Sequence, residues 1–321
     1  VIEGDLNINS LSWLTDIDLP CLTEVEGDIE LGMLPALANL DGLSGLTAVG
    51  GTLSIHNNAL LSDITGLSSL ESADRIAIQS TPSLSTLEGL EGLLPEMPEL
   101  MLTLMPSLTS LEALVGITEV DGPLDIRDNV SLGSLSGLET LERVRGELKI
   151  EGNSTLANID SFDSLVETDG DLLIRDNPAL DAIDTFPNLT AVGGNLTVSG
   201  NDSLVSVSGF NALTDVEFVS VVFNDDLESV GGFGGLATAL GLNISVNESL
   251  VSVEGFEALA TLSTSGFHFY ENESATALPD LPSLVSVANV YIDSNESLVD
   301  IDGLDSISEV TENITITENY E

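Results

Sequence analysis

The chain has 321 residues, of which 54 are Asp or Glu and 6 are Lys or Arg, so its formal net charge is −48. This charge excludes duplex nucleic acid as a partner and disfavours an anionic membrane surface, because both are bound through clustered basic residues. The composition is nevertheless 42% hydrophobic, so the chain can bury a large core and is not of the disordered class.

Other features of the composition concern redox chemistry and membranes. The one cysteine, Cys21, cannot form an internal disulfide. No apolar run approaches the ~20 residues of a membrane helix, so we expect no membrane insertion. The sequence starts at Val1 without the charged and apolar regions of a signal peptide, and we expect the mature portion or a fragment of a longer chain. An acidic surface that holds hydrated cations is typical of a halophilic or marine protein.

A repeat of 23 to 25 residues covers the chain. The segments that begin at Val49 and Val192 match residue for residue, with the consensus V-x-G-x-L-x-I-x-x-N-x-x-L-x-x-L-x-G-L-x-x-L. The repeats leave no room for a linker, so we expect a single solenoid domain over residues 1–321. The apolar residue of position 7 recurs at Ile8, Leu31, Ile55, Ile78, Leu102, Ile126, Ile150, Ile174, Val198, Val221, Ile244, Phe269, Ile292 and Ile316.

Each repeat predicts one short strand followed by turns. Positions 5 and 7 are apolar between polar neighbours, which is the period of a strand with one buried face. Positions 13, 16, 19 and 22 are apolar at a spacing of three, and many repeats carry Gly at position 18, as at Gly66 and Gly209. That pattern favours 3₁₀ turns or further short strands over an α-helix. The predicted fold is all-β, a right-handed parallel β-helix or leucine-rich-repeat-like solenoid of about fourteen coils.

Position 10 is Asn in most repeats. An inward Asn at a solenoid corner can donate to and accept from backbone groups that the turn leaves unpaired, so stacked copies predict a structural ladder. Leu34, Thr81 and Met105 occupy this position in early repeats, and we expect the N-terminal third to be less regular. The ladder residues are Asn58, Asn129, Asn153, Asn177, Asn201, Asn224, Asn247, Asn272, Asn295 and Asn319.

The recurring Gly-x-Leu-x-Ile-x-x-Asn-x-x-Leu pattern resembles the leucine-rich-repeat-like units of the receptor L-domain family. It is similar in particular to repeats of fungal cell-wall proteins and bacterial surface proteins. The resemblance extends over essentially the entire chain. It implies an extracellular, non-enzymatic interaction or structural module.

No catalytic, metal or cofactor site is predicted. His56 and His268 lie far apart in the sequence at outward strand positions, where we expect solvated side chains, and with one cysteine they form neither a metal triad nor a Cys-His pair. Carboxylates are so abundant that two neighbouring acids carry no information about catalysis. Acidic stretches such as 160–171 and 224–226 predict weak, diffuse Ca²⁺ binding.

Ten Asn-x-Ser/Thr sequons occur, and six of them start at ladder residues that should point inward. The outward candidates for glycosylation are Asn188, Asn195, Asn243 and Asn313. Their use depends on the host.

Positions 6 and 8 of each repeat form two columns on the outer sheet face. Arg127, Lys149 and Arg175 lie there in three successive repeats and are a candidate surface for an acidic partner or glycan. The alternative, which we favour slightly, is a set of cross-strand ion pairs that involve Asp125 and Glu151.

A second candidate surface is aromatic. His268, Tyr270 and Tyr291 project from adjacent repeats at the same two outward positions. Such rings can stack on sugar rings or anchor a protein interface.

Three functions are compatible with these patterns. The leading interpretation is an extracellular cell-surface recognition or adhesion module that binds glycan or protein through its sheet face. The second is a structural subunit of a wall, sheath or filament that self-associates through the unpaired strand edges of its ends. A polysaccharide-acting enzyme is the least favoured.

Overall fold

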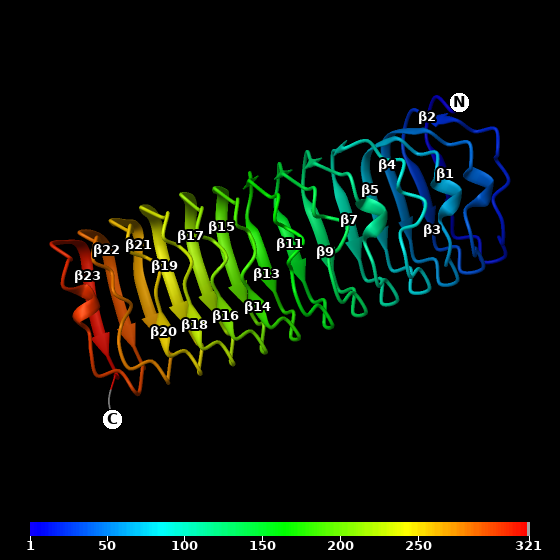
Figure 1. Ribbon diagram of the computed structural model, residues 1–321. Coiled ribbons are helices and arrows are strands. Elements are labelled where there is room, and N and C mark those ends of the chain that lie inside the picture. Colours follow the sequence, from blue (N-terminus) through cyan, green and yellow to red (C-terminus); the bar gives the residue numbers. More distant parts are fainter. Residues whose placement is uncertain (320–321) are drawn as a thin grey trace. The chain divides into compact units, whose positions relative to one another are not determined.

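The computed structural model describes residues 1–319, and the chain divides into two compact units, Val1–Leu156 and Ala157–Glu321. Each unit is a β-solenoid in which the strands of successive coils pair in parallel (Figure 1). The predicted parallel, leucine-rich-repeat-like solenoid is confirmed. The single domain over residues 1–321 stays a prediction.

In the first unit, seven strands carry the position-7 residues and pair coil by coil. They are β1 (Leu6–Asn9), β3 (Ile29–Gly32), β4 (Ala48–His56), β5 (Ser72–Gln79), β7 (Leu100–Thr103), β9 (Leu124–Arg127) and β11 (Leu148–Glu151). Shorter elements precede or follow them. These are the strands β2 (Glu24–Val25), β6 (Glu96–Met97), β8 (Glu119–Val120) and β10 (Arg143–Val144), and the 3₁₀ turns η1 (Asp41–Leu43), η2 (Thr65–Leu67) and η3 (Glu112–Leu114).

The second unit has the same plan with longer strands. Its seven main strands are β13 (Leu172–Arg175), β15 (Ala191–Ser199), β17 (Asp215–Val222), β19 (Thr238–Ser245), β21 (Thr261–Tyr270), β22 (Ser286–Asp293) and β23 (Glu309–Thr317). A second sheet forms from β14 (Ala182–Ile183), β16 (Ser206–Val207), β18 (Ser229–Val230) and β20 (Ser252–Val253). The remaining elements are β12 (Glu167–Thr168) and the 3₁₀ turn η4 (Asp302–Leu304).

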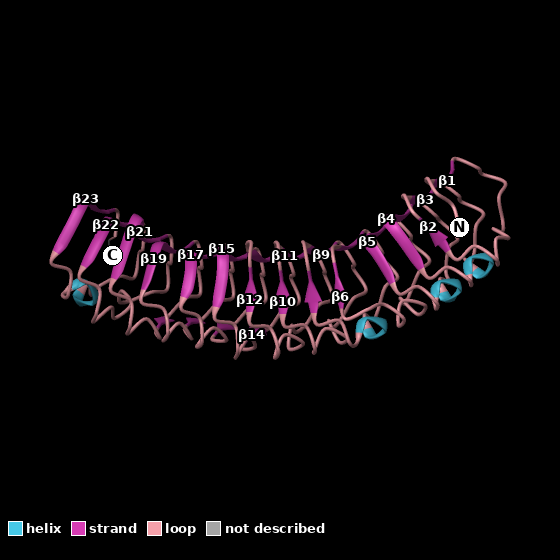
Figure 2. Cartoon of the chain, turned by 90° about the horizontal axis from the view of Figure 1, so that it is seen from above, coloured by secondary structure: helices cyan, strands magenta, loops and turns pink. Residues whose placement is uncertain are grey.

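The core follows the predicted period. Leu53 and Ile55 of β4 are fully buried, whereas Ser54 between them is half-buried on the outer face. The 3₁₀ turns lie on the opposite side of their unit from the main strands (Figure 2). Gly66 in η2 packs so closely on the coil before it that an added Cβ would collide with the Leu40 carbonyl oxygen, which explains why position 18 favours glycine. None of the helices within residues 1–319 is long and apolar enough to span a membrane.

A stack of phenylalanine rings fills the core of the second unit at position 19. Successive ring centroids lie 4.9 to 5.4 Å apart, close to face-to-face. All five rings are fully buried, whereas Leu43, Leu67 and their counterparts occupy this position in the first unit. The stacked residues are Phe162, Phe186, Phe210, Phe233 and Phe256.

The asparagine ladder is present and points inward. In the second unit, Asn224 Oδ1 accepts a hydrogen bond from the backbone N–H of Asn201 at 3.1 Å, and Asn224 Nδ2 donates to the Val198 carbonyl at 3.2 Å. Every ladder residue from Asn58 to Asn295 is fully buried. The ladder therefore satisfies backbone groups that the corner leaves without partners.

The corner itself does not depend on the ladder. The residue at position 9 has a left-handed φ in every coil, including 54° at Met33, 53° at Ser80 and 57° at Leu104, which precede the substituted positions. Leu34, Thr81 and Met105 are themselves fully buried. The expectation of a less regular N-terminal third is therefore wrong for the corner backbone, because another buried side chain, Leu34, Thr81 or Met105, fills the same space.

Candidate functional site

The outer face of the first unit carries Arg127 on β9 and Lys149 on β11. The register places Lys149 opposite Asp125 and Glu151 opposite Arg127, as expected. The close ion pairs, however, join residues two apart in the chain: Arg127 Nε lies 2.6 Å from Asp125 Oδ1, and Lys149 Nζ lies 2.8 Å from Glu147 Oε1. The hydrogen bond that Arg127 Nε donates to Asp125 Oδ1 raises the pKa of Arg127. Each of these cations is therefore held by the carboxylate two residues before it in the chain.

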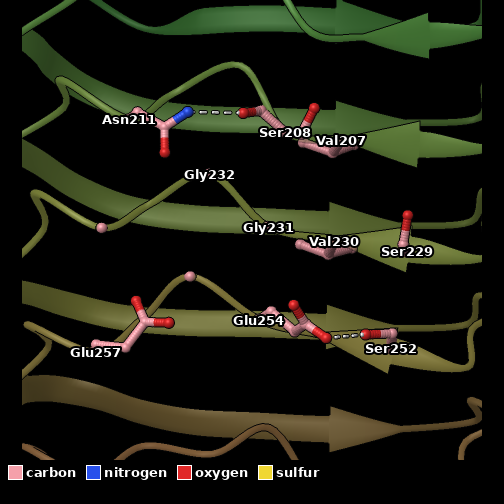
Figure 3. A pocket seen from close by; sticks show the side chains of 12 residues that line it. Val207, Ser208, Asn211, Ser229, Val230, Gly231, Gly232, Ser252, Glu254 and Glu257 are labelled. Atoms are coloured by element: carbon pink, nitrogen blue, oxygen red, sulfur yellow. Dashed lines mark hydrogen bonds between the residues drawn. The ribbon is translucent and has the colours of Figure 1, made fainter.

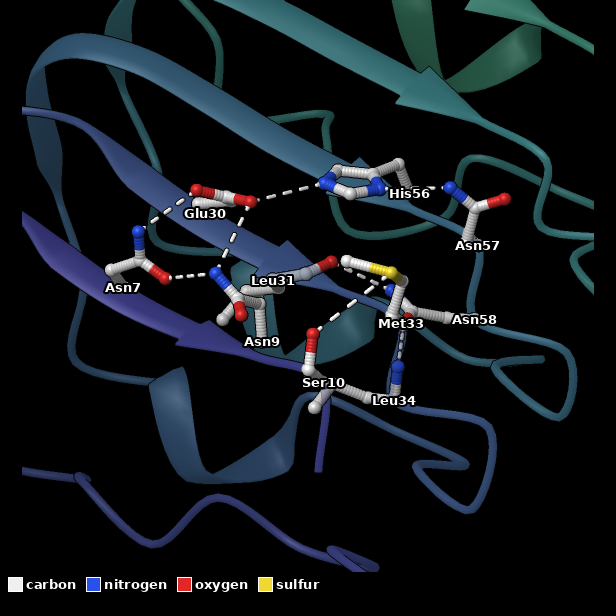
Figure 4. Close-up of polar contacts among 10 residues, drawn as sticks. All are labelled: Asn7, Asn9, Ser10, Glu30, Leu31, Met33, Leu34, His56, Asn57 and Asn58. Atoms are coloured by element: carbon white, nitrogen blue, oxygen red, sulfur yellow. Dashed lines mark hydrogen bonds and ion pairs between the residues drawn. The ribbon is translucent and has the colours of Figure 1, made fainter. Parts of the chain in front are cut away.

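A polar cluster surrounds Glu30 on the same face of the first unit (Figure 4). His56 Nε2 lies 3.4 Å from Glu30 Oε1, and Asn7 Nδ2 donates to Glu30 Oε2 at 2.9 Å. The His56 ring occupies the space over Gly32, where any Cβ would collide with it. His56 is therefore outward, as expected, but it is packed and paired rather than freely solvated.

In the second unit, Arg175 ends β13, half-buried and in register with Ser199. The three aromatic candidates lie on β21 and β22. Tyr291 is central to them, since its ring centroid is 5.9 Å from that of His268 and 5.7 Å from that of Tyr270. The structure therefore brings His268, Tyr270 and Tyr291 together as one group, which we call the aromatic cluster.

Polar groups adjoin the aromatic cluster. A hollow of about 410 Å³ is lined by His268 and Tyr291 together with Ser265, Asn289 and Thr315. The Ser265 carbonyl lies 3.0 Å from His268 Nε2. Because a carbonyl oxygen only accepts, His268 Nε2 is the donor in this contact.

The amides of the hollow form a chain across two strands. Asn289 Nδ2 donates to Glu312 Oε2 at 2.9 Å, and Asn313 Nδ2 donates to Asn289 Oδ1 at 3.4 Å. Asn313 is exposed and Asn289 is half-buried. Their amide groups thus lie beside the aromatic rings at a solvent-accessible surface.

Tyr291 is held in its neutral form. Desolvation by its neighbours, followed by the carboxylate of Asp293, raises the pKa of the Tyr291 phenol above its ordinary value of 10.0. The ring therefore presents a protonated hydroxyl, which both donates and accepts hydrogen bonds.

The outer face of the second unit has another aromatic residue, Phe218 on β17, that the periodicity alone did not identify. Its ring lies over Gly241 of the next coil, where an added Cβ would collide with it. In the sequence, the signal is that Phe218 and Gly241 occupy the same position of successive repeats. Asn243, two residues further along β19, has its Oδ1 buried without a hydrogen-bond partner in the described part of the chain.

A different hollow, of about 510 Å³, lies beside the second sheet of this unit (Figure 3). Ser252 donates to Glu254 Oε1 at 3.1 Å and Asn211 Nδ2 donates to the Ser208 carbonyl at 3.1 Å within it. Gly232, with φ of 80°, approaches the Ser208 carbonyl too closely for a Cβ. The hollow thus follows from glycine-rich turns, and it contains none of the residues singled out in the sequence.

The four sequons outside the ladder differ in access. Asn188 and Asn313 are exposed, whereas Asn195 and Asn243 are half-buried between neighbouring strands, so the expectation of exposure holds for two of them. Glycosylation of any of the four stays a prediction. Within residues 1–319, no group of three or more His, Cys, Asp or Glu side chains is arranged to hold a metal ion, and diffuse Ca²⁺ binding likewise stays a prediction.

The comparisons with known proteins add two similar structures. No family model matches the chain, and no curated protein sequence does. A leucine-rich repeat protein from Bacteroides ovatus is similar over 95% of this chain and 82% of its own, with 14% identity and a TM-score of 0.40. YopM from Yersinia enterocolitica is similar over 99% of this chain and 90% of its own, with 18% identity and a TM-score of 0.16.

Proposed function

We propose that this chain is an extracellular recognition module that binds a neutral glycan through the outer sheet face of its second unit. The observation that carries the proposal is the aromatic cluster, in which the ring centroids of His268 and Tyr270 lie within 6 Å of that of Tyr291. The extracellular location is supported by the resemblance of the repeat to those of cell-wall and surface proteins.

The chemistry of the cluster suits a sugar. Aromatic faces pack against the apolar faces of pyranose rings, while amide and hydroxyl groups exchange hydrogen bonds with sugar hydroxyls. Asn289, Asn313 and Thr315 supply such groups next to Tyr291. The strands β21 and β22, which carry the aromatic cluster, are paired on both sides, so little ordering entropy opposes binding there.

The negative charge of the protein favours neutral over acidic glycans. The chain carries a net charge of −48, and Glu312 and Asp293 lie beside the cluster. Sialylated, sulfated or uronic-acid-rich glycans are repelled by such a surface. We therefore expect neutral oligosaccharides to bind.

Binding of the purified protein to an array of neutral and acidic glycans tests this proposal. Tyr291→Ala should weaken binding of the selected neutral glycan by about tenfold or more, as expected for a central aromatic anchor. Trp13→Ala is the matched control, because Trp13 in the first unit is a large aromatic residue that is 71% exposed. Absence of saturable neutral-glycan binding, or equal binding by wild type and Tyr291→Ala, would refute the proposal.

A further inference from the structure

The corner at position 9 imposes a left-handed backbone on whichever residue occupies it. Glycine, asparagine and aspartate adopt this conformation most readily, and they occupy the corner at Gly152, Gly200, Asn57 and Asp128. Phenylalanine and the β-branched valine adopt it at a cost in stability. Phe223 and Val246 nevertheless occupy two successive corners of the second unit, with φ of 58° and 55°.

Phe223 and Val246 occupy equivalent corners of adjacent coils. Val222 and Ser245 are in register on β17 and β19, so the residues that follow them, Phe223 and Val246, lie on neighbouring coils. Phe223 is 56% exposed and Val246 is half-buried. Gly200 occupies the corner of the preceding coil and has no side chain to cover the Phe223 ring.

The surroundings of Phe223 and Val246 are acidic. Glu271 occupies the next corner, and Asp225, Asp226 and Glu248 follow Phe223 and Val246 in the turns of the same coils, all of them exposed. No Lys or Arg occurs after Arg175 in the sequence. The second unit beyond Arg175 therefore offers no lysine or arginine of its own to these carboxylates.

We propose that Phe223 and Val246 form a docking site for a lysine- or arginine-rich segment of a partner protein, which places an apolar side chain against them. The exposed ring and valine accept the apolar anchor, and the surrounding carboxylates pair with its flanking cations. The Phe223 ring is 56% exposed at a strained corner, so it adds little to the stability of the fold, and we take binding as the contribution that accounts for it. This surface adjoins the aromatic cluster, since the Val246 N–H donates to the Tyr270 carbonyl at 2.9 Å. Its residues are none of those in the cluster, and the proposal does not depend on glycan binding.

Two synthetic peptides of equal length and equal lysine content test the proposal. One carries a central pair of leucines and the other carries serines at those positions. Their affinities for the protein are compared by calorimetry at ~0.15 M salt, where charges further apart than ~8 Å are screened. Wild type should bind the leucine peptide about tenfold or more tightly than the serine peptide, as expected for an apolar anchor in a docking site.

The variant Phe223→Asn/Val246→Asn should abolish that difference and raise the melting temperature, because asparagine tolerates the left-handed corner. Leu104→Asn is the matched control, since Leu104 is 49% exposed with φ of 57° in the first unit. Leu104→Asn should raise the melting temperature and keep the tenfold preference for the leucine peptide. Tyr291→Ala should also keep this preference. Equal affinity of the two peptides for wild type, a preference that survives in the double variant, or a lower melting temperature of that variant would overturn the proposal.

Discussion

Replacing Asn224 by leucine tests the inward ladder quantitatively. Asn224 Nδ2 donates to the carbonyls of Val198 and Val222, and its Oδ1 accepts from the Asn201 N–H. The substitution leaves at least two buried backbone groups without these partners, at about 1–3 kcal/mol each. Burial of the leucine side chain returns about 1.5–3 kcal/mol, and Leu34 shows that the corner has room for it. We expect a net loss of about 2 kcal/mol in the free energy of unfolding.

Urea unfolding followed by circular dichroism measures this loss as a lower midpoint at unchanged slope. Ser220→Ala is the control, because Ser220 lies on the same coil, half-buried on the outer face. If Asn224→Leu unfolds at the same midpoint as Ser220→Ala, the ladder does not stabilise the corner and the reasoning is refuted.

Two further predictions concern the ring stack and the aromatic cluster. Phe210 is fully buried between Phe186 and Phe233, so Phe210→Ala should lower the free energy of unfolding by about 3–5 kcal/mol. Phe210→Leu should cost less, and equal losses in thermal melts would contradict a packed stack. The negative charge of Asp293 disfavours the Tyr291 phenolate, so Asp293→Asn should lower the pKa of Tyr291 in an absorbance titration. The variant Tyr291→Phe identifies the part of the titration that belongs to Tyr291. An unchanged midpoint in Asp293→Asn would contradict the stated cause.

The period of the sequence was sufficient to predict the main strands, the buried positions and the ladder. Positions 5 and 7 could only share one face of a strand, and a polar Asn that recurs at a corner needs buried backbone partners. The same logic brought His268, Tyr270 and Tyr291 together, because residues at equal positions of successive coils become neighbours.

The period could not predict features that depend on side-chain reach or backbone angle. Arg127 pairs with Asp125 on its own strand rather than across strands. Its side chain is long and flexible, and Glu151 and Asp128 also act on its charge, so the repeat position alone does not fix the partner. The left-handed corner is invisible in the sequence, because position 9 holds residues as different as Gly200, Phe223 and Glu271. Phe218 was missed because its site depends on the absence of a side chain at Gly241 in the next coil.

The most direct test of the account is a crystal structure of the protein with the neutral oligosaccharide that binds best on the array. The account predicts a sugar ring packed against Tyr291, with hydroxyl groups hydrogen-bonded to Asn289 or Asn313. An oligosaccharide bound to another surface, with Tyr291 free of contact, would contradict the assignment of the sheet face of the second unit as the recognition surface.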